Sequence, residues 1–330
     1  MTISKKIFSK LVLIAIGFLA GWFIFHGKDQ VNNSTVQQVR GDSHYQFINP
    51  LIECEVEGQT LLNKYVPFKW EMQKRIEDEV IGRNQDTHLA LYFRNLNNGP
   101  WFGIDEQENF APASLLKVPL MIAYFKESES NPSLLGQTLS FDGADSGLPD
   151  QIFGSSSHLD PGQSYTVEEL VRRMIVYSDN DAMSLLMKNF PKDKLYQIYT
   201  DLGVTNPYGQ ENDNVLSVRD YASFFRILYN AAYLEKDTSD KALKYLSEAE
   251  FKEGLVAGIP RNIVIAHKFG ERALEEGEHP QQLHDCGIVY YKPYPYLICV
   301  MTRGNDAQIL SQMIARTSKI VFEEVSKSYP

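Results

Sequence analysis

The stretch FAPASLLK, residues 110–117, decides how the chain is read, because it joins an extended segment to an apolar helix. The helix is predicted over Ser114 to Glu127, where apolar residues dominate. Residues three positions apart share one face of a helix, so Ser114 and Lys117 place a hydroxyl beside an amine. A desolvated lysine can take the proton of a serine hydroxyl, and a helix start directs backbone N–H groups at an incoming carbonyl. About one Ser-x-x-Lys is expected by chance in a chain of this length, so the pattern alone is weak.

Outward from this stretch, strand and helix patterns follow a definite order. Before it, a helix is predicted over Phe68–Ile81, and strands over His88–Arg94 and Trp101–Ile104. After it come helical patterns, then strand patterns, then a closing helix capped by Asn305: Val167–Tyr177, Ala182–Phe190, Lys194–Leu202, Val218–Tyr233, Ile263–Lys268, Gly287–Tyr291, Tyr296–Thr302 and Asp306–Val325. This order predicts an α/β (α+β) fold, in which terminal helices flank an antiparallel sheet and an all-helical region is inserted at about 128–250.

Two further short elements contain residues suited to chemistry. The turn Ser178-Asp179-Asn180 offers a hydroxyl for proton transfer and an amide to hold a substrate, but these residue types are also the preferred helix caps. The segment His267-Lys268-Phe269-Gly270 ends a predicted strand, where a lysine suits a substrate carboxylate but also suits a solvated strand end. Taken singly, each element favours the structural explanation.

Taken together, the three elements resemble the motifs of the serine β-lactamase and penicillin-binding-protein superfamily, which are Ser-x-x-Lys, Ser-Asp-Asn and Lys-Thr-Gly. They occur in the same order, 64 and 90 residues apart, at a helix start, a turn and a strand. The resemblance is closest to class A β-lactamases and runs from about Asn49 to the C-terminus. It implies a β-lactamase/transpeptidase-like fold and a serine hydrolase that works through an acyl-enzyme, with no cofactor and no metal.

The resemblance also implies which residues form and break bonds. Ser114 is expected to be the acylated nucleophile, and Lys117 its general base. Ser178 is expected to pass a proton to the leaving nitrogen, helped by Lys117 and Lys268.

Other residues are expected to hold the substrate. Asn180 would bind its amide side chain, and Lys268 followed by Gly270 would attract its carboxylate. The oxyanion hole would be formed by the backbone N–H groups of Ser114 and Glu271.

The third motif departs from the family at Phe269, where the family has Ser or Thr. That hydroxyl bonds the substrate carboxylate, and a phenyl ring has no polar atom that can do so. Losing a hydrogen bond to a charged group weakens recognition by about 1.5–3 kcal/mol. Unless His267 or Arg272 supplies another donor, we expect poor binding of the usual β-lactam carboxylate.

The second departure concerns the water that hydrolyses the acyl-enzyme. Class A β-lactamases activate it with a glutamate on a loop between the second and third motifs. The sole glutamate between Asp181 and Leu234 is Glu211, in a segment that resembles the family loop poorly. Glu211 is therefore the candidate deacylation base, and a solvated turn residue is the alternative.

Three functions remain open on this evidence. The first is a serine hydrolase of class A β-lactamase type that acts on a β-lactam or a related amide. The second is a D-alanyl carboxypeptidase or transpeptidase-like penicillin-binding protein that acts on a peptidoglycan stem peptide. The third is a β-lactam sensor that is acylated without turnover.

Composition limits the remaining classes of partner and cofactor. The net charge of -10 argues against nucleic-acid binding, which needs a basic surface. The chain has three cysteines and no Cys-x-x-Cys pair, so we predict no structural metal site. Cys286 and Cys299 lie on two arms of one predicted hairpin, where a disulfide and two free thiols are both compatible with the sequence. We expect a monomer.

The N-terminal residues predict attachment to a membrane. Leu11 to Phe25 is an apolar run with Lys5, Lys6 and Lys10 before it, and bulky residues occupy the place of a cleavage signal. We expect an uncleaved anchor over residues 1–28, a polar linker over 29–44 and a catalytic domain over 45–330. The lysines place that domain outside the cytoplasm. A cleaved signal peptide, which would give a secreted protein, is the alternative.

Overall fold

The structure is a computed structural model that describes residues 45–50, 66, 68–84, 86–97, 99–144, 147, 151–154, 157–208, 215–272 and 281–328. The predicted anchor and linker, residues 1–44, lie outside the described residues, and so does Glu211. Among the helices that are described, none combines the length and the apolar character needed to cross a membrane.

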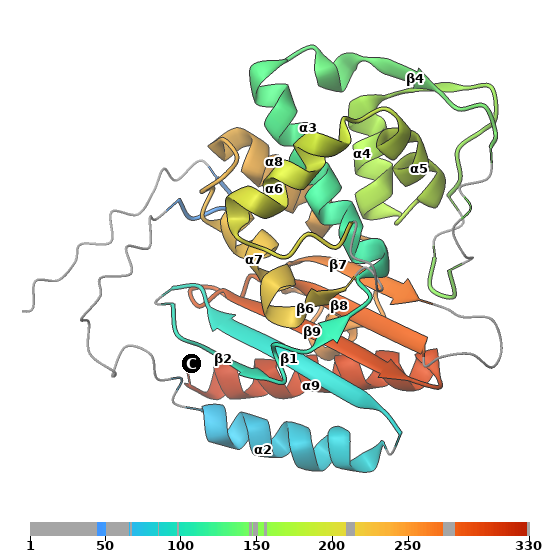
Figure 1. Ribbon diagram of the computed structural model, residues 1–330. Coiled ribbons are helices and arrows are strands. Elements are labelled where there is room, and N and C mark those ends of the chain that lie inside the picture. Colours follow the sequence, from blue (N-terminus) through green and yellow to red (C-terminus); the bar gives the residue numbers. More distant parts are fainter. Residues whose placement is uncertain are drawn as a thin grey trace, which may run out of the picture. The chain divides into compact units, whose positions relative to one another are not determined.

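A five-stranded antiparallel sheet forms the centre of the fold (Figure 1). Its strand order is β2-β1-β9-β8-β7. The strands are β1 (His88–Asn95), β2 (Trp101–Ile104), β7 (Ile265–Arg272), β8 (Gln281–Val289) and β9 (Tyr296–Gly304). Because β7 is an edge strand, alternate backbone N–H groups on its outer side have no partner strand.

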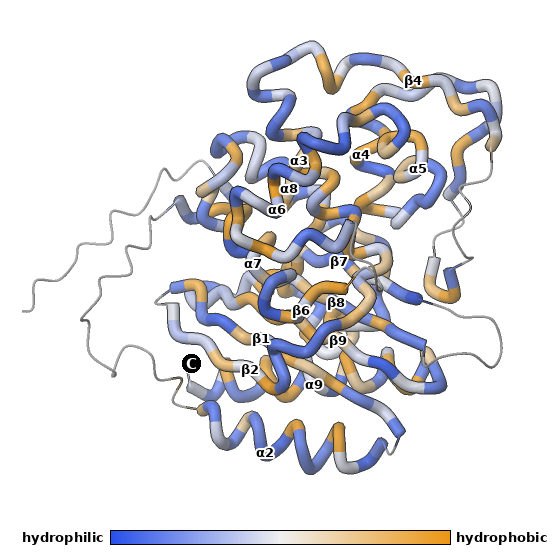
Figure 2. The backbone as a smooth tube through the Cα atoms, in the orientation of Figure 1, coloured by the Kyte–Doolittle hydropathy of each residue, from blue (hydrophilic) through white to orange (hydrophobic). Residues whose placement is uncertain are grey.

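Helices cover both faces of this sheet. Helices α2 (Lys69–Glu79) and α9 (Ala307–Ser328) lie on one face, and the helical region lies on the other (Figure 1). Helix α2 alternates between hydrophilic and hydrophobic residues (Figure 2), and its buried side chains are Met72 and Ile76. This is the pattern of a helix with a single buried face.

The strands explain why two cores form. Along β9, Ile298 and Val300 belong to the core beneath α2 and α9, whereas Leu297, Cys299 and Met301 belong to the core on the helical side. Successive side chains of a strand point to opposite faces, so a strand buried on both faces has a continuous apolar sequence.

The helical region is inserted between the first two strands of the sheet and the last three. It contains α3 (Lys117–Ser130), α4 (Val167–Val176), α5 (Asn180–Lys188), α6 (Lys192–Leu202), α7 (Val218–Tyr229) and α8 (Lys236–Ser247). Short strand pairs join its segments: β3 (Asn109–Phe110) with β6 (Leu216–Ser217), and β4 (Thr138–Ser140) with β5 (Ser164–Thr166). Single 3-10 turns complete the described elements: η2 (Ile81–Arg83), η3 (Ala113–Leu116), η4 (Leu134–Gly136) and η5 (Leu255–Gly258).

The predicted fold class is confirmed, but the strand predicted over Gly287–Tyr291 is longer in the structure, where β8 spans Gln281–Val289. It begins at Gln281 rather than at Gly287. Buried polar residues interrupt its apolar pattern: His284 lies 3.0 Å from the carbonyl oxygen of Ala111, and Asp285 is fully buried. Burial lowers the pKa of His284 to about 4, so this histidine is neutral at pH 7.

Helix positions differ from the sequence patterns in several places, and among them α3 begins at Lys117, after the 3-10 turn η3, rather than at Ser114. The patterns do not predict α8, because its first turn is polar and its apolar face begins only at Ala242. Helix α7 ends at Tyr229 rather than at Tyr233. Asp306, not Asn305, caps α9, since its Oδ1 accepts the backbone N–H groups of Gln308 at 2.8 Å and Ile309 at 3.2 Å.

The two hairpin cysteines form a disulfide. Cys286 of β8 and Cys299 of β9 are direct partners in the antiparallel register, and their Cα atoms lie 3.9 Å apart. The covalent bond therefore joins two central strands on the helical side of the sheet.

Candidate active site

The nucleophile predicted from the sequence lies in a tight turn at the start of α3. Ser114 belongs to η3 and is 8% exposed. The preceding Ala113 has a φ of 48°, a backbone conformation that is unfavourable for a residue with a Cβ atom. The N–H of Leu115 donates to the carbonyl of Pro112 at 2.9 Å, and the Tyr221 hydroxyl donates to the carbonyl of Leu115 at 3.1 Å. These bonds hold the Ser114 turn in place.

Strand β7 lies directly against this turn because Gly270 has no side chain. A Cβ atom at Gly270 would lie 2.8 Å from the carbonyl oxygen of Pro112 and 3.0 Å from the nitrogen of Leu115. The close approach brings the outer edge of β7 beside Ser114. Gly270 and the backbone of Glu271 thus lie at the border of the candidate site, and their roles stay predictions.

Lys117 connects α3 to the second motif. Its side chain is fully buried. The Nζ atom donates to the carbonyl of Ser178 at 2.5 Å and to Oδ1 of Asn180 at 2.7 Å, and it lies 3.1 Å from Oγ of Ser178. The first and second motifs therefore meet at one amine.

Lys268 brings the third motif to the same point. Its Nζ donates to Oγ of Ser178 at 2.9 Å and to the carbonyl of Phe269 at 2.9 Å. The Ser178 hydroxyl thus lies between two buried amines that come from opposite sides of the site. The structure brings together Ser114, Lys117, Ser178, Asn180 and Lys268, although their chemical roles remain predictions.

Burial changes the proton affinity of both amines. Burial and the nearby Lys268 hold the pKa of Lys117 well below its ordinary value. Burial also lowers the pKa of Lys268 to about 7, against the opposing effect of Asp285 and Glu271. A lowered pKa means that the amine loses its proton at a lower pH, and its lone pair can then accept a proton from a nearby hydroxyl.

The second motif forms the helix cap that the sequence allowed and also places its other two residues in the candidate site. Asp179 caps α5, since its Oδ1 accepts the N–H of Ala182 at 3.0 Å. Ser178, one residue earlier, has a φ of 56° and turns its side chain toward the lysines. The cap fixes the turn, and the turn presents Ser178 and Asn180 to the site.

Gln151 is a site residue that the sequence analysis missed. Its Nε2 donates to Oγ of Ser114 at 2.9 Å, and it lies 3.3 Å from Oγ of Ser178 and 3.4 Å from Oδ1 of Asn180. No local pattern marks it, because it lies outside the helices and strands and is separated from the second motif by β5 and α4. Its carboxamide occupies the space between the three groups that are expected to handle a substrate amide.

Glu271 contributes its side chain as well as its backbone. One carboxylate oxygen accepts the N–H of Phe153 at 3.1 Å, and the other is buried with no hydrogen-bond partner among the described residues. Burial raises the pKa of this carboxyl group, against the lowering effect of the two lysines. The family resemblance implied a role only for its N–H group.

The Phe269 side chain has no hydrogen-bond donor for a carboxylate and packs against another aromatic ring. Its ring stacks on Phe251, with the ring centres 4.2 Å apart. His267 is buried, with Nδ1 2.8 Å from Oδ1 of Asp285, and its Nε2 has no hydrogen-bond partner among the described residues. A role of His267 as a donor to the substrate carboxylate therefore stays a prediction.

Within the described residues, His88, Asp105 and Glu108 form a group whose ligand atoms could hold a metal ion. Arg303 already pairs with Glu108. The five residues Ser114, Lys117, Ser178, Asn180 and Lys268 are called the catalytic cluster below. The group around His88 shares no residue with this cluster and is separate from the candidate active site.

Comparisons with known proteins agree with the motifs. A model of the "Beta-lactamase enzyme family" matches residues 71–325. The structure of PBP-A is 24% identical over 78% of this chain and 96% of its own, with a TM-score of 0.66. A PBP-A mutant, solved as an acyl-enzyme complex with penicillin G, is 24% identical over 78% of this chain and 97% of its own, with a TM-score of 0.65. A β-lactamase from Chitinophaga pinensis DSM 2588 is 20% identical over 77% of this chain and 99% of its own, with a TM-score of 0.67. At these identities, the structural likeness establishes the fold alone.

The burial of Lys268 predicts a measurable dependence of stability on pH. Its pKa is lower in the folded state, so between about pH 7 and pH 10 the unfolded chain binds more protons and stability rises with pH. Lys268→Met should remove up to about 1.4 kcal/mol per pH unit from this slope. Urea unfolding at pH 7, 8 and 9 measures it.

The exposed Lys192 provides the matched control. Lys192→Met should leave the slope unchanged. If Lys268→Met and Lys192→Met have equal slopes, then Lys268 is not held neutral by the fold.

Proposed function

Because the chain belongs to the β-lactamase enzyme family, we propose that it is a serine hydrolase that opens a β-lactam or a related amide through an acyl-Ser114 intermediate. The observation that carries this proposal is the meeting of Lys117, Lys268 and the Ser178 hydroxyl beside a buried serine. Two lysines with lowered pKa at one hydroxyl supply both a base for the nucleophile and a route for the proton.

The proposed reaction has two steps. In the first, Lys117 takes the proton of Ser114 as Oγ attacks the carbonyl carbon, and the N–H groups of Ser114 and Glu271 stabilise the oxyanion. The proton then moves through Ser178 to the nitrogen as the amide C–N bond breaks. In the second, water attacks the ester, and Ser114 regains its proton. Glu211 stays the candidate base for that water.

A penicillin-binding protein that acts on a peptidoglycan stem peptide is the second candidate. The observation that favours it is that the sole glutamate between Asp181 and Leu234, Glu211, lies in a segment that resembles the deacylation loop of class A β-lactamases poorly. Without a glutamate that activates water, acylation can proceed but the ester should persist. The apolar run of residues 11–25 supports a tether that would hold the domain outside the cytoplasmic membrane, where both substrates occur.

A fluorescent penicillin tests the proposed nucleophile. We expect covalent labelling of the wild-type chain, loss of the label in Ser114→Ala and full labelling in the exposed control Ser133→Ala. Intact cells should be labelled by a derivative that cannot cross the cytoplasmic membrane. Equal labelling of Ser114→Ala and the wild type would contradict the mechanism.

The lifetime of the label separates the two candidate functions. Release within seconds together with ring-opened product supports the hydrolase. A label that persists for hours supports the penicillin-binding protein and removes Glu211 from an active role in deacylation.

Gln151 predicts a gain of reactivity on substitution. A substrate amide must displace its carboxamide from Ser114, Ser178 and Asn180, and one or two net hydrogen bonds are worth about 1–2 kcal/mol. Gln151→Ala should therefore raise the acylation rate constant roughly tenfold. Stopped-flow labelling measures this, with the exposed Gln163→Ala as control. A slower Gln151→Ala would mean that this amide binds the substrate instead of competing with it.

A further inference from the structure

A pocket that is separate from the candidate active site lies between the sheet and the helical region. Its volume is about 670 Å³, within the range of sites that hold small organic molecules. Strands β1 and β2 form one wall, and the end of α6 with the first turns of α7 form the other. None of its lining residues belongs to the catalytic cluster.

The lining of this pocket is strongly cationic. Arg94 from β1 and both Arg219 and Arg226 from α7 line it, against a single carboxylate, Asp220. In a chain with a net charge of -10, a local excess of positive charge opposes the overall balance. Such an excess within a concave surface attracts anions.

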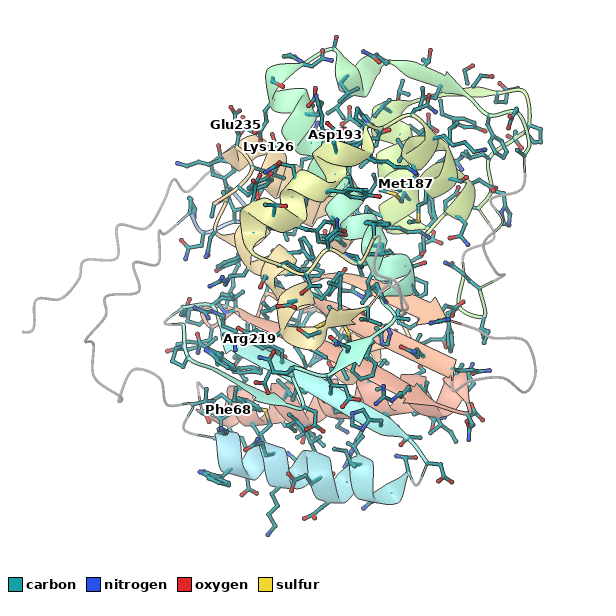
Figure 3. All side chains as sticks on the ribbon, viewed as in Figure 1. Phe68, Lys126, Met187, Asp193, Arg219 and Glu235 are labelled. Carbon is teal, nitrogen blue, oxygen red and sulfur yellow. A yellow bond between two sulfur atoms is a disulfide. The ribbon has the colours of Figure 1, made fainter. Side chains whose placement is uncertain are left out.

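The spacing along α7 explains how one helix supplies two of these arginines. Arg219, Ser223 and Arg226 are separated by four and then three positions, so they share one face of the helix. All three line the pocket. Arg219 is at the junction of α7 with the sheet (Figure 3).

Aromatic packing positions the arginine of this junction. The Arg219 guanidinium lies 4.7 Å from the ring centre of Trp101, and Trp101 stacks on Tyr92 with ring centres 5.5 Å apart. Among the described residues, neither Arg219 nor Arg226 forms an ion pair with a carboxylate, whereas Arg75, Arg172 and Arg303 each do. Two guanidinium groups in the pocket therefore retain donors for a ligand.

We propose that this pocket binds a phosphate group, either as the free anion or as the monoester of a small molecule. A phosphate monoester carries about 1.5 to 2 negative charges at pH 7 and presents three acceptor oxygens. The planar guanidinium fork matches phosphate oxygens in pairs, so Arg219 and Arg226 on one face of α7 can hold one dianion. The Ser223 hydroxyl supplies a neutral donor on the same helix face.

Isothermal titration calorimetry of the full chain tests the site, with sodium phosphate and glycerol 3-phosphate as probes at constant ionic strength. The wild type should bind at least one probe in a saturable manner. The double variant Arg219→Gln/Arg226→Gln should bind at least tenfold more weakly. Arg261→Gln, which removes an exposed arginine outside the pocket, should bind like the wild type.

Circular dichroism confirms that each variant is folded, and the single variant Arg226→Gln keeps the test decisive if the double variant is unstable. Tighter binding of glycerol 3-phosphate identifies an esterified phosphate as the ligand, and equal binding identifies the free anion. Absence of binding to the wild type, or equal affinity of the wild type and the pocket variants, overturns the proposal. Neither result depends on the reaction at Ser114.

Discussion

The site depends on one buried hydroxyl, that of Ser178, held between the amines of Lys117 and Lys268. Each amine reaches it from a different part of the chain: Lys117 from the helix that begins after the nucleophile, and Lys268 from the edge strand of the sheet. Burying two lysines side by side disfavours their charged forms, and this lowers the pKa of both amines. The burial that is costly to the fold therefore also moves the two amines toward the form that can accept a proton.

Two hydrophobic cores make that arrangement rigid. The sheet is packed on both faces, and the disulfide between Cys286 and Cys299 joins two of its central strands. Strand β7 lies at the border of this scaffold, and Gly270 lets it approach the Ser114 turn more closely than a side chain would allow. The candidate catalytic groups therefore lie on elements that the two cores hold in place, and Gln151 is the group that we propose a substrate displaces.

Features that depend on local sequence patterns could be predicted from the sequence. The order of elements and the α+β class followed from periodicity, whereas the joining of the three motifs in one site was implied by the family resemblance. The sequence did not predict Gln151, whose contacts cross 27 to 37 positions of the chain. The predicted β8 was also too short, because His284 and Asp285 are buried there and pair with residues distant in the sequence. These two polar side chains are buried because hydrogen-bond partners compensate for the loss of water. A local sequence pattern does not reveal partners that lie far away in the sequence.

The reactivity proposed for the site depends on the protonation states of Lys117 and Lys268. ¹⁵N NMR of the two side-chain nitrogens during a pH titration measures these states. Lys268 should titrate at about pH 7, and Lys117 should titrate well below the ordinary value of 10.5. Assignment through Lys117→Met and Lys268→Met tells the two signals apart. Titration of both amines near pH 10.5 would show that each is an ordinary cation at neutral pH and would contradict the account.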